Sequence, residues 1–151
     1  MSSSQFMAAL SAATRAALPK GFRPLRSAHR SWLCQLYPRD PRLHYEVWNM
    51  GQWRNKIELG LHFESRDHAL NRKLLAGFDR RMVEIKATLG PQWEAEMWDK
   101  GWAKVYEVLP YERFSTDTLA ATARRLARAI TVLQPLWDDV TESAAARRAG
   151  Q

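Results

Sequence analysis

The sequence predicts an α+β fold, in which an antiparallel sheet of four to five strands carries two long helices on one face and a short N-terminal helix. Two patterns predict it: side chains alternate strictly over residues 56–64, and apolar residues recur at three- and four-residue steps over 65–89 and 115–140. The chain of 151 residues is 46% apolar and 26% charged, which is typical of a single globular domain spanning residues 1–151.

The first 43 residues combine a helix pattern with a proline-rich connector. Apolar side chains at helical spacing over residues 5–18 predict a short amphipathic helix, and Pro19 ends it. Residues 19–43 contain four prolines and many arginines. Within them, residues 31–37 predict a short strand, and the flanking prolines favour an edge position in the sheet.

The next segment, residues 44–90, predicts two strands and a long helix. Residues 44–50 form the first strand and residues 56–64 the second, which we expect to bury Ile57, Leu59, Leu61 and Phe63 under the helices. Ser65 is the expected N-cap of a single helix that runs to about Leu89, where Gly90 and a proline stop it.

Residues 93–140 repeat this order. Strands are predicted at 93–98 and 102–109, joined by a short turn at 99–101 and followed by a helix capped by Ser115 or Thr116. On the first of these strands, Met97 is expected in the core. Pro135 is expected to kink the last helix, and residues 141–151 to fray.

The two halves match at an offset of 50 residues, which suggests an internal ββα repeat. Glu46 aligns with Glu96, Trp48 with Trp98, and Gly51 with Gly101. The alternative is convergence, since any hairpin favours a turn glycine and an apolar strand. If the repeat is structural, both tryptophans occupy the same face of the sheet.

The net charge of +7 comes almost entirely from the N-terminal third, because residues 1–43 hold seven basic residues and one acidic residue. Such a basic segment can attract nucleic-acid phosphates, or it can simply aid solubility. The residues that would contact nucleic acid are Arg23, Arg26, Arg30, Arg39 and Arg42.

The sheet face away from the helices is the candidate binding surface for a ligand or a partner. It gathers acidic, basic and aromatic side chains, which are Glu46, Trp48, Glu58, His62, Glu96, Trp98 and Lys104. A solvated face with cross-strand ion pairs is the alternative. A metal site built from His44, Glu46, Glu58 and His62 across neighbouring strands is conceivable, but no ligand motif marks it, and the sequence assigns neither a metal nor a cofactor.

No catalytic residue is assigned. Cys34 lies in a predicted strand, where a cysteine is usually a small buried apolar group. Phosphate-binding glycine loops are absent from the sequence, and the acids and lysines lack the adjacent strand positions that a metal-dependent nuclease would use.

Residues 54–140 resemble a family of uncharacterised bacterial domains found at the end of proteins associated with restriction systems. The resemblance lies in the order of the strand NKIELGLHFES, the helix RDHALNRKLLAGFDRRMVEIKATLG, the strand WEAEMW, the strand GWAKVYEVL and a closing helix. It implies an independent α+β module involved in nucleic-acid transactions and transfers no catalytic residue.

These observations predict a non-enzymatic interaction or regulatory module, expected as a homodimer in a bacterial cytoplasm. A nucleic-acid-binding accessory domain is the first alternative, and a small-molecule-binding or enzymatic domain on the Glu/His/Trp face is the second. No apolar run approaches the roughly 20 residues that a membrane-spanning helix needs, so no membrane association is expected.

Overall fold

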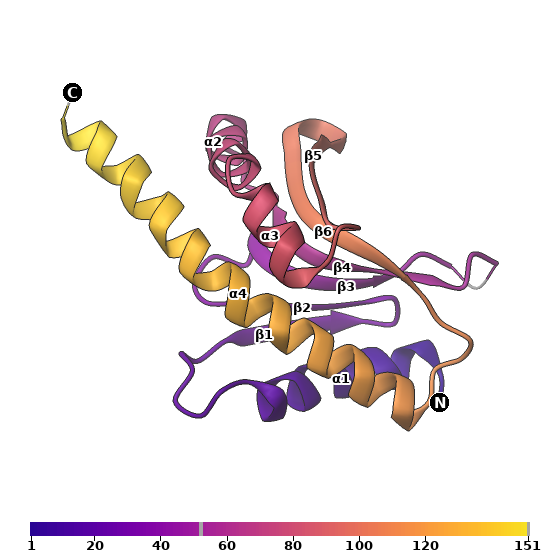
Figure 1. The fold of residues 1–151 in the computed structure, drawn as a ribbon. Coiled ribbons are helices and arrows are strands. Elements are labelled where there is room, and N and C mark those ends of the chain that lie inside the picture. The colour runs from indigo at the N-terminus through magenta and orange to yellow at the C-terminus, as the bar shows by residue number, and fades with distance from the viewer. Residues whose placement is uncertain (52, 151) are drawn as a thin grey trace.

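The computed structural model describes residues 1–51 and 53–150, with residues 144 and 146–148 described by their backbone alone. It shows an α+β fold with one antiparallel sheet of six strands in the order β1-β2-β3-β4-β6-β5 (Figure 1). The strands are β1 (Arg26–Arg30), β2 (Leu33–Tyr37), β3 (Leu43–Asn49), β4 (Lys56–Phe63), β5 (Glu94–Trp98) and β6 (Trp102–Pro110). The helices are α1 (Ser3–Ala17), α2 (His68–Asp79), α3 (Met82–Leu89) and α4 (Thr116–Ala149).

Strand β4 lies in the centre of the sheet and organises the core. Its side chains Ile57, Leu59, Leu61 and Phe63 are at most 2% exposed, which confirms the predicted alternation. They pack with apolar residues of the helices in one core cluster. On the side of β4 opposite the helices, Glu58, Gly60 and His62 are also buried, and this face carries the polar residues described below.

The sixth strand, β1, is the element that the sequence analysis misses. It pairs antiparallel with β2 at the edge of the sheet, and all five of its residues are exposed. A strand without a buried side has no apolar alternation, so nothing in its sequence distinguishes it from a connector.

The predicted single helix over residues 65–89 is wrong in two respects. It is broken at Arg80 and Arg81 into α2 and α3, and the Arg81 side chain donates to the carbonyl of Gly77 across the break. Its N-cap is Asp67, whose carboxylate accepts from the Leu70 N–H. Ser65 instead accepts from the Asp67 N–H and so stabilises the turn before the helix.

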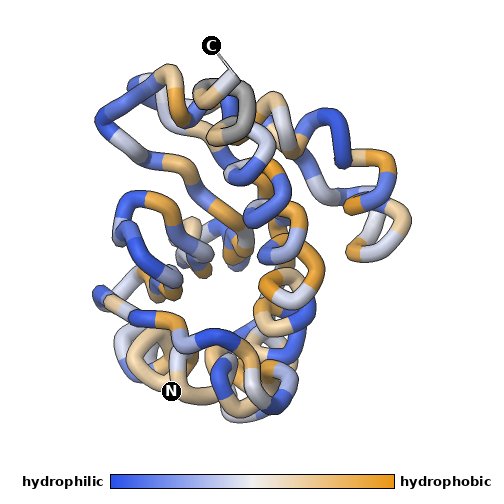
Figure 2. The backbone as a smooth tube through the Cα atoms, turned by 90° about the vertical axis from the view of Figure 1, so that its left-hand side faces the viewer, coloured by the Kyte–Doolittle hydropathy of each residue, from blue (hydrophilic) through white to orange (hydrophobic). Residues whose placement is uncertain are grey.

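The last helix begins as predicted, because the Ser115 hydroxyl accepts from the Thr118 N–H. Helix α4 then continues to Ala149 with Pro135 inside it, so its helical assignment includes residues that were expected to fray. The alternation of hydrophobic and hydrophilic residues along the helices and strands can be followed in Figure 2. None of the helices among residues 1–51 and 53–150 is both long and apolar enough to cross a lipid bilayer.

The two hairpins share one feature that the suggested repeat predicts. Gly51 and Gly101 both adopt positive φ, at 109° and 81°. In the register, Trp48 pairs with Glu58 and Trp98 with Trp102, which places both tryptophans on the face without helices. The superposition of the two halves remains a prediction. Met97, expected in the core, is 39% exposed, because it lies on the edge strand β5, which has a neighbouring strand on one side only.

Candidate metal centre

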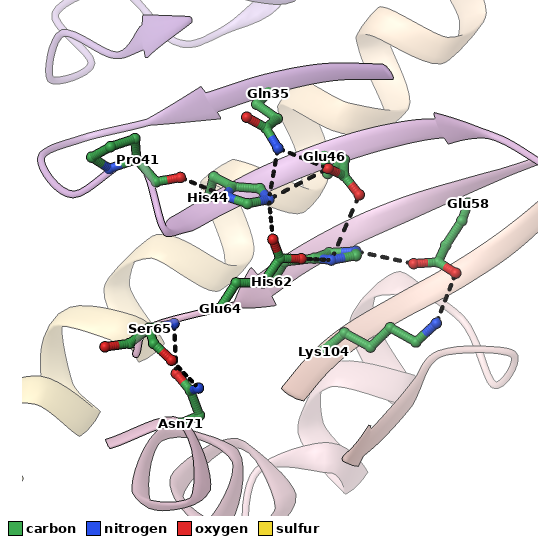
Figure 3. Close-up of polar contacts among 10 residues, drawn as sticks. All are labelled: Gln35, Pro41, His44, Glu46, Glu58, His62, Glu64, Ser65, Asn71 and Lys104. Atoms are coloured by element: carbon green, nitrogen blue, oxygen red, sulfur yellow. Dashed lines mark hydrogen bonds and ion pairs between the residues drawn. The ribbon is translucent and has the colours of Figure 1, made fainter. Parts of the chain in front are cut away.

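A polar cluster lies on the open face, by which we mean the side of the sheet opposite helices α1 to α4. His44 and Glu46 come from β3, Glu58 and His62 from β4, and Glu64 directly follows β4. The register pairs His44 with His62, and it pairs Glu46 with Gly60. Because Gly60 has no side chain, the Glu46 carboxylate can extend toward the His62 ring (Figure 3).

His44 is held in one tautomer by the backbone. Its Nδ1 lies 2.7 Å from the carbonyl oxygen of Pro41, which can only accept, so Nδ1 carries the proton. In the neutral ring Nε2 then carries a lone pair, which accepts from the Gln35 amide nitrogen. Nε2 lies 3.4 Å from Glu46 Oε1 and 3.9 Å from Glu64 Oε1, with the Gln35 amide nitrogen 3.2 Å away (Figure 3).

His62 contacts carboxylates through both ring nitrogens. Nε2 lies 3.0 Å from Glu58 Oε1, while Nδ1 lies 3.0 Å from Glu64 Oε2 and 3.6 Å from Glu46 Oε2. Burial alone would lower the pKa of His62, but these carboxylates outweigh it and raise the pKa to about 9. At neutral pH the ring is therefore an imidazolium that donates to Glu58 and Glu64.

The pKa values of the carboxylates Glu46 and Glu58 shift in the opposite direction, downward. Burial would raise the pKa of Glu46, but the neighbouring His44 ring, the charge of His62 and the hydrogen bond from the Gln35 amide lower it to about 2. For Glu58, the contacts with His62 and Lys104 likewise overcome burial and lower the pKa. Lys104 Nζ lies 2.9 Å from Glu58 Oε2, so Glu58 bridges the lysine and the imidazole (Figure 3).

This arrangement has the donor set of a transition-metal site. One ligand atom each from His44, Glu46 and His62 lies within 4.8 Å of the others. Tetrahedral zinc with bonds of about 2.0–2.1 Å places its ligand atoms about 3.3 Å apart. The distances of 3.4 Å from His44 to Glu46 and 3.6 Å from His62 to Glu46 are close to this spacing. Glu64 is the available fourth ligand.

The structure brings most of the sequence-predicted binding residues to this place. Trp98 lies edge-on to His62 with ring centroids 5.8 Å apart, and Lys104 Nζ lies 5.1 Å from the Trp98 ring centre. Glu96 is one strand further out and accepts from the Tyr106 hydroxyl at 2.8 Å. Trp48 shares the face beside Glu58.

Sequence reasoning missed Glu64 and Gln35 as members of the cluster. Glu64 follows Glu58, Gly60 and His62 in the alternation of β4, so its face could be predicted. Gln35 reaches the cluster from β2, where it pairs with Glu46, and only the strand register reveals this. Its amide nitrogen donates to Glu46 Oε1 at 2.9 Å.

Cys34 lies on the helix-covered side of the sheet, away from this cluster. It is completely buried, and burial raises its pKa to about 12. Its thiol therefore stays protonated at neutral pH, which is unsuitable for a nucleophile.

The five N-terminal arginines do not behave alike. Arg23 forms an ion pair with Asp138 of α4 at 2.5 Å, so its charge is neutralised within the fold. Arg26 and Arg30 lie on the exposed edge strand β1, whereas Arg39 and Arg42 are exposed around the β2–β3 connection. Nucleic-acid contact by these arginines, expected from the sequence, is the alternative to the arginine-lined groove described below.

Comparisons of the chain with family models, with curated proteins and with solved structures find no match.

Proposed function

We propose that this protein is a non-enzymatic regulatory or interaction module that binds one divalent transition-metal ion, zinc being the best fit, on the open face of its sheet. The ligands are His44 Nε2, His62 Nδ1 and the carboxylates of Glu46 and Glu64. These residues join β3 to β4, so a bound ion would stiffen the surface that a partner could contact.

The observation that carries this proposal is the orientation of the two imidazoles. Metal-binding histidines usually donate their second N–H to a carbonyl or a carboxylate, which sets the tautomer and aims the free nitrogen. His44 donates to the Pro41 carbonyl and His62 to Glu58, while their other nitrogens converge on Glu46 and Glu64. Both outer partners are therefore already in place.

The charges of the cluster support a dication. Without metal, the His62 imidazolium and Lys104 oppose three carboxylates, which leaves one negative charge. A metal ion would replace the proton on His62 Nδ1, and its two charges with that of Lys104 would balance Glu46, Glu58 and Glu64. Imidazole nitrogen with carboxylate oxygen suits zinc better than calcium or magnesium, which prefer oxygen alone.

Isothermal titration of chelator-treated protein with Zn²⁺ tests the proposal. We expect one site per chain, and we expect His44→Gln and Glu46→Gln to abolish measurable binding. Glu58→Gln, which removes an outer partner rather than a ligand, should weaken binding about 10- to 100-fold.

The matched control is His29→Gln, which changes an exposed histidine on β1 outside the cluster and should leave binding unaffected. Circular dichroism of each variant establishes that it is folded. Absence of zinc binding by the folded wild-type protein, or equal loss in His29→Gln, would contradict the proposal.

A further inference from the structure

A second candidate site lies on the other side of the molecule, at the beginning of helix α4. An open groove of about 780 Å³ is lined by the end of β6, the loop after it and the first three turns of α4. Its charged lining residues are Arg113, Arg124, Arg125, Arg128, Glu112 and Asp117. Four guanidinium groups therefore face two carboxylates.

The four arginines of this groove differ in whether another residue already holds their side chains. Arg125 is held by Glu107, which is buried and accepts from Arg125 Nη2 at 2.7 Å. Arg128 donates to the Thr88 carbonyl at 3.0 Å, which fixes its position beside the groove. Arg113 and Arg124 are exposed, and neither has an ion-pair partner in the part of the chain that the structure describes.

The arrangement along α4 concentrates these groups. Arg124, Arg125 and Arg128 are spaced one and four residues apart, so they lie on one side of the helix, and Arg113 stands in the loop before its first turn. The N-terminal end of a helix also carries partial positive charge. Asp117 in the first turn offsets part of that charge, which leaves the arginines as the main electrostatic feature.

We propose that this groove binds the phosphate group of a ligand. The planar guanidinium group can donate two parallel hydrogen bonds to the oxygens of one phosphate. Arg113 and Arg124 are available for this, since neither has an ion-pair partner among the residues that the structure describes. The phosphate could belong to a nucleic-acid backbone or to a small phosphate compound. The proposal is independent of the metal centre, because the groove lies on the helix-covered side of the sheet.

Fluorescence anisotropy at low salt tests this proposal with a labelled DNA duplex and a labelled single strand, with pyrophosphate as a competitor. We expect Arg113→Gln/Arg124→Gln to weaken binding at least tenfold. For duplex DNA, the salt slope should fall by about 2, since each lost phosphate contact removes about 0.9. Competition by pyrophosphate at micromolar concentration, with weak binding of both DNA probes, would assign the groove to small phosphate compounds.

The matched control is Arg26→Gln/Arg30→Gln, which removes the same charge from edge strand β1. We expect this variant to bind like the wild-type protein. The proposal would be overturned if the folded wild type bound none of the probes at low salt. It would also be overturned if the β1 variant lost binding while the groove variant kept it, because the N-terminal arginines would then be the contact.

Discussion

The residue on which the polar cluster depends is His62. It is buried, yet it carries a proton because three carboxylates surround its ring. Without a bound cation, that proton is what holds Glu46, Glu58 and Glu64 together. The same ring nitrogen is the one that a metal would occupy, so proton and metal compete for Nδ1.

The stability of the metal-free protein should therefore depend on pH through His62. Its pKa is raised from 6.5 to about 9, so its favourable contribution is fully present below pH 6.5 and is lost as the pH rises through 9. We expect the free energy of unfolding in urea to fall over this range by an amount on the order of 1–3 kcal/mol. In His62→Gln this dependence should disappear, and an equal fall in both proteins would contradict the role of His62.

Gly60 allows the cluster to form, because it lies opposite Glu46 in the sheet. A Cβ atom at this position would lie 2.7 Å from the Tyr106 Cα and closer still to the carbonyl oxygen of Val105. Since backbone atoms cannot move aside easily, we expect Gly60→Ala to lower the free energy of unfolding by about 1–3 kcal/mol, measured in urea. Unchanged stability would show that the sheet is looser here than the structure indicates.

At the scale of elements, the sequence predicts those helices and strands whose apolar residues alternate or recur at helical spacing. The buried side of β4 and the cap at Ser115 follow from side-chain pattern alone, whereas the alternation along β6 leaves its buried side undecided. The break between α2 and α3 does not, because Leu74, Phe78, Met82 and Ile85 continue one apolar stripe across it. Edge strand β1 leaves no pattern either, since none of its residues is buried.

The polar cluster could be predicted in part. Alternation along β4 places Glu58, His62 and Glu64 on one side, but their meeting with His44 and Glu46 depends on the register between β3 and β4. The connection over residues 50–55 is longer than a two-residue turn, whose type would dictate the register. The pairing of His44 with His62 is therefore visible only in the structure.

The assignment of Asp67, rather than Ser65, as the N-cap of α2 can be tested by mutation. Asp67→Ala removes the carboxylate that accepts from the Leu70 N–H and should lower the free energy of unfolding by about 1 kcal/mol. Asp79→Ala makes the same substitution at the other end of the helix, where a negative charge opposes the helix dipole, and should be neutral or slightly stabilising. Urea denaturation of both variants measures this, and equal effects would argue against the cap.

At the scale of the whole molecule, the helices are on one side of the sheet (Figure 1), and the strand register places the cluster on the other. The helix side holds the apolar core and so provides the stability of the fold. The open side can then carry a cluster of buried charged groups that contributes to ligand binding rather than to the stability of the fold. This division of the two faces is the reason for assigning the function to the open side.

The most direct test is a crystal structure of the zinc-loaded protein with anomalous scattering data collected at the zinc edge. The account predicts one strong peak between His44 Nε2 and His62 Nδ1, about 2.0–2.1 Å from each nitrogen, with Glu46 and Glu64 completing the coordination. A zinc-soaked crystal with no peak in this cluster, and with His62 still donating to Glu58 and Glu64, would contradict it.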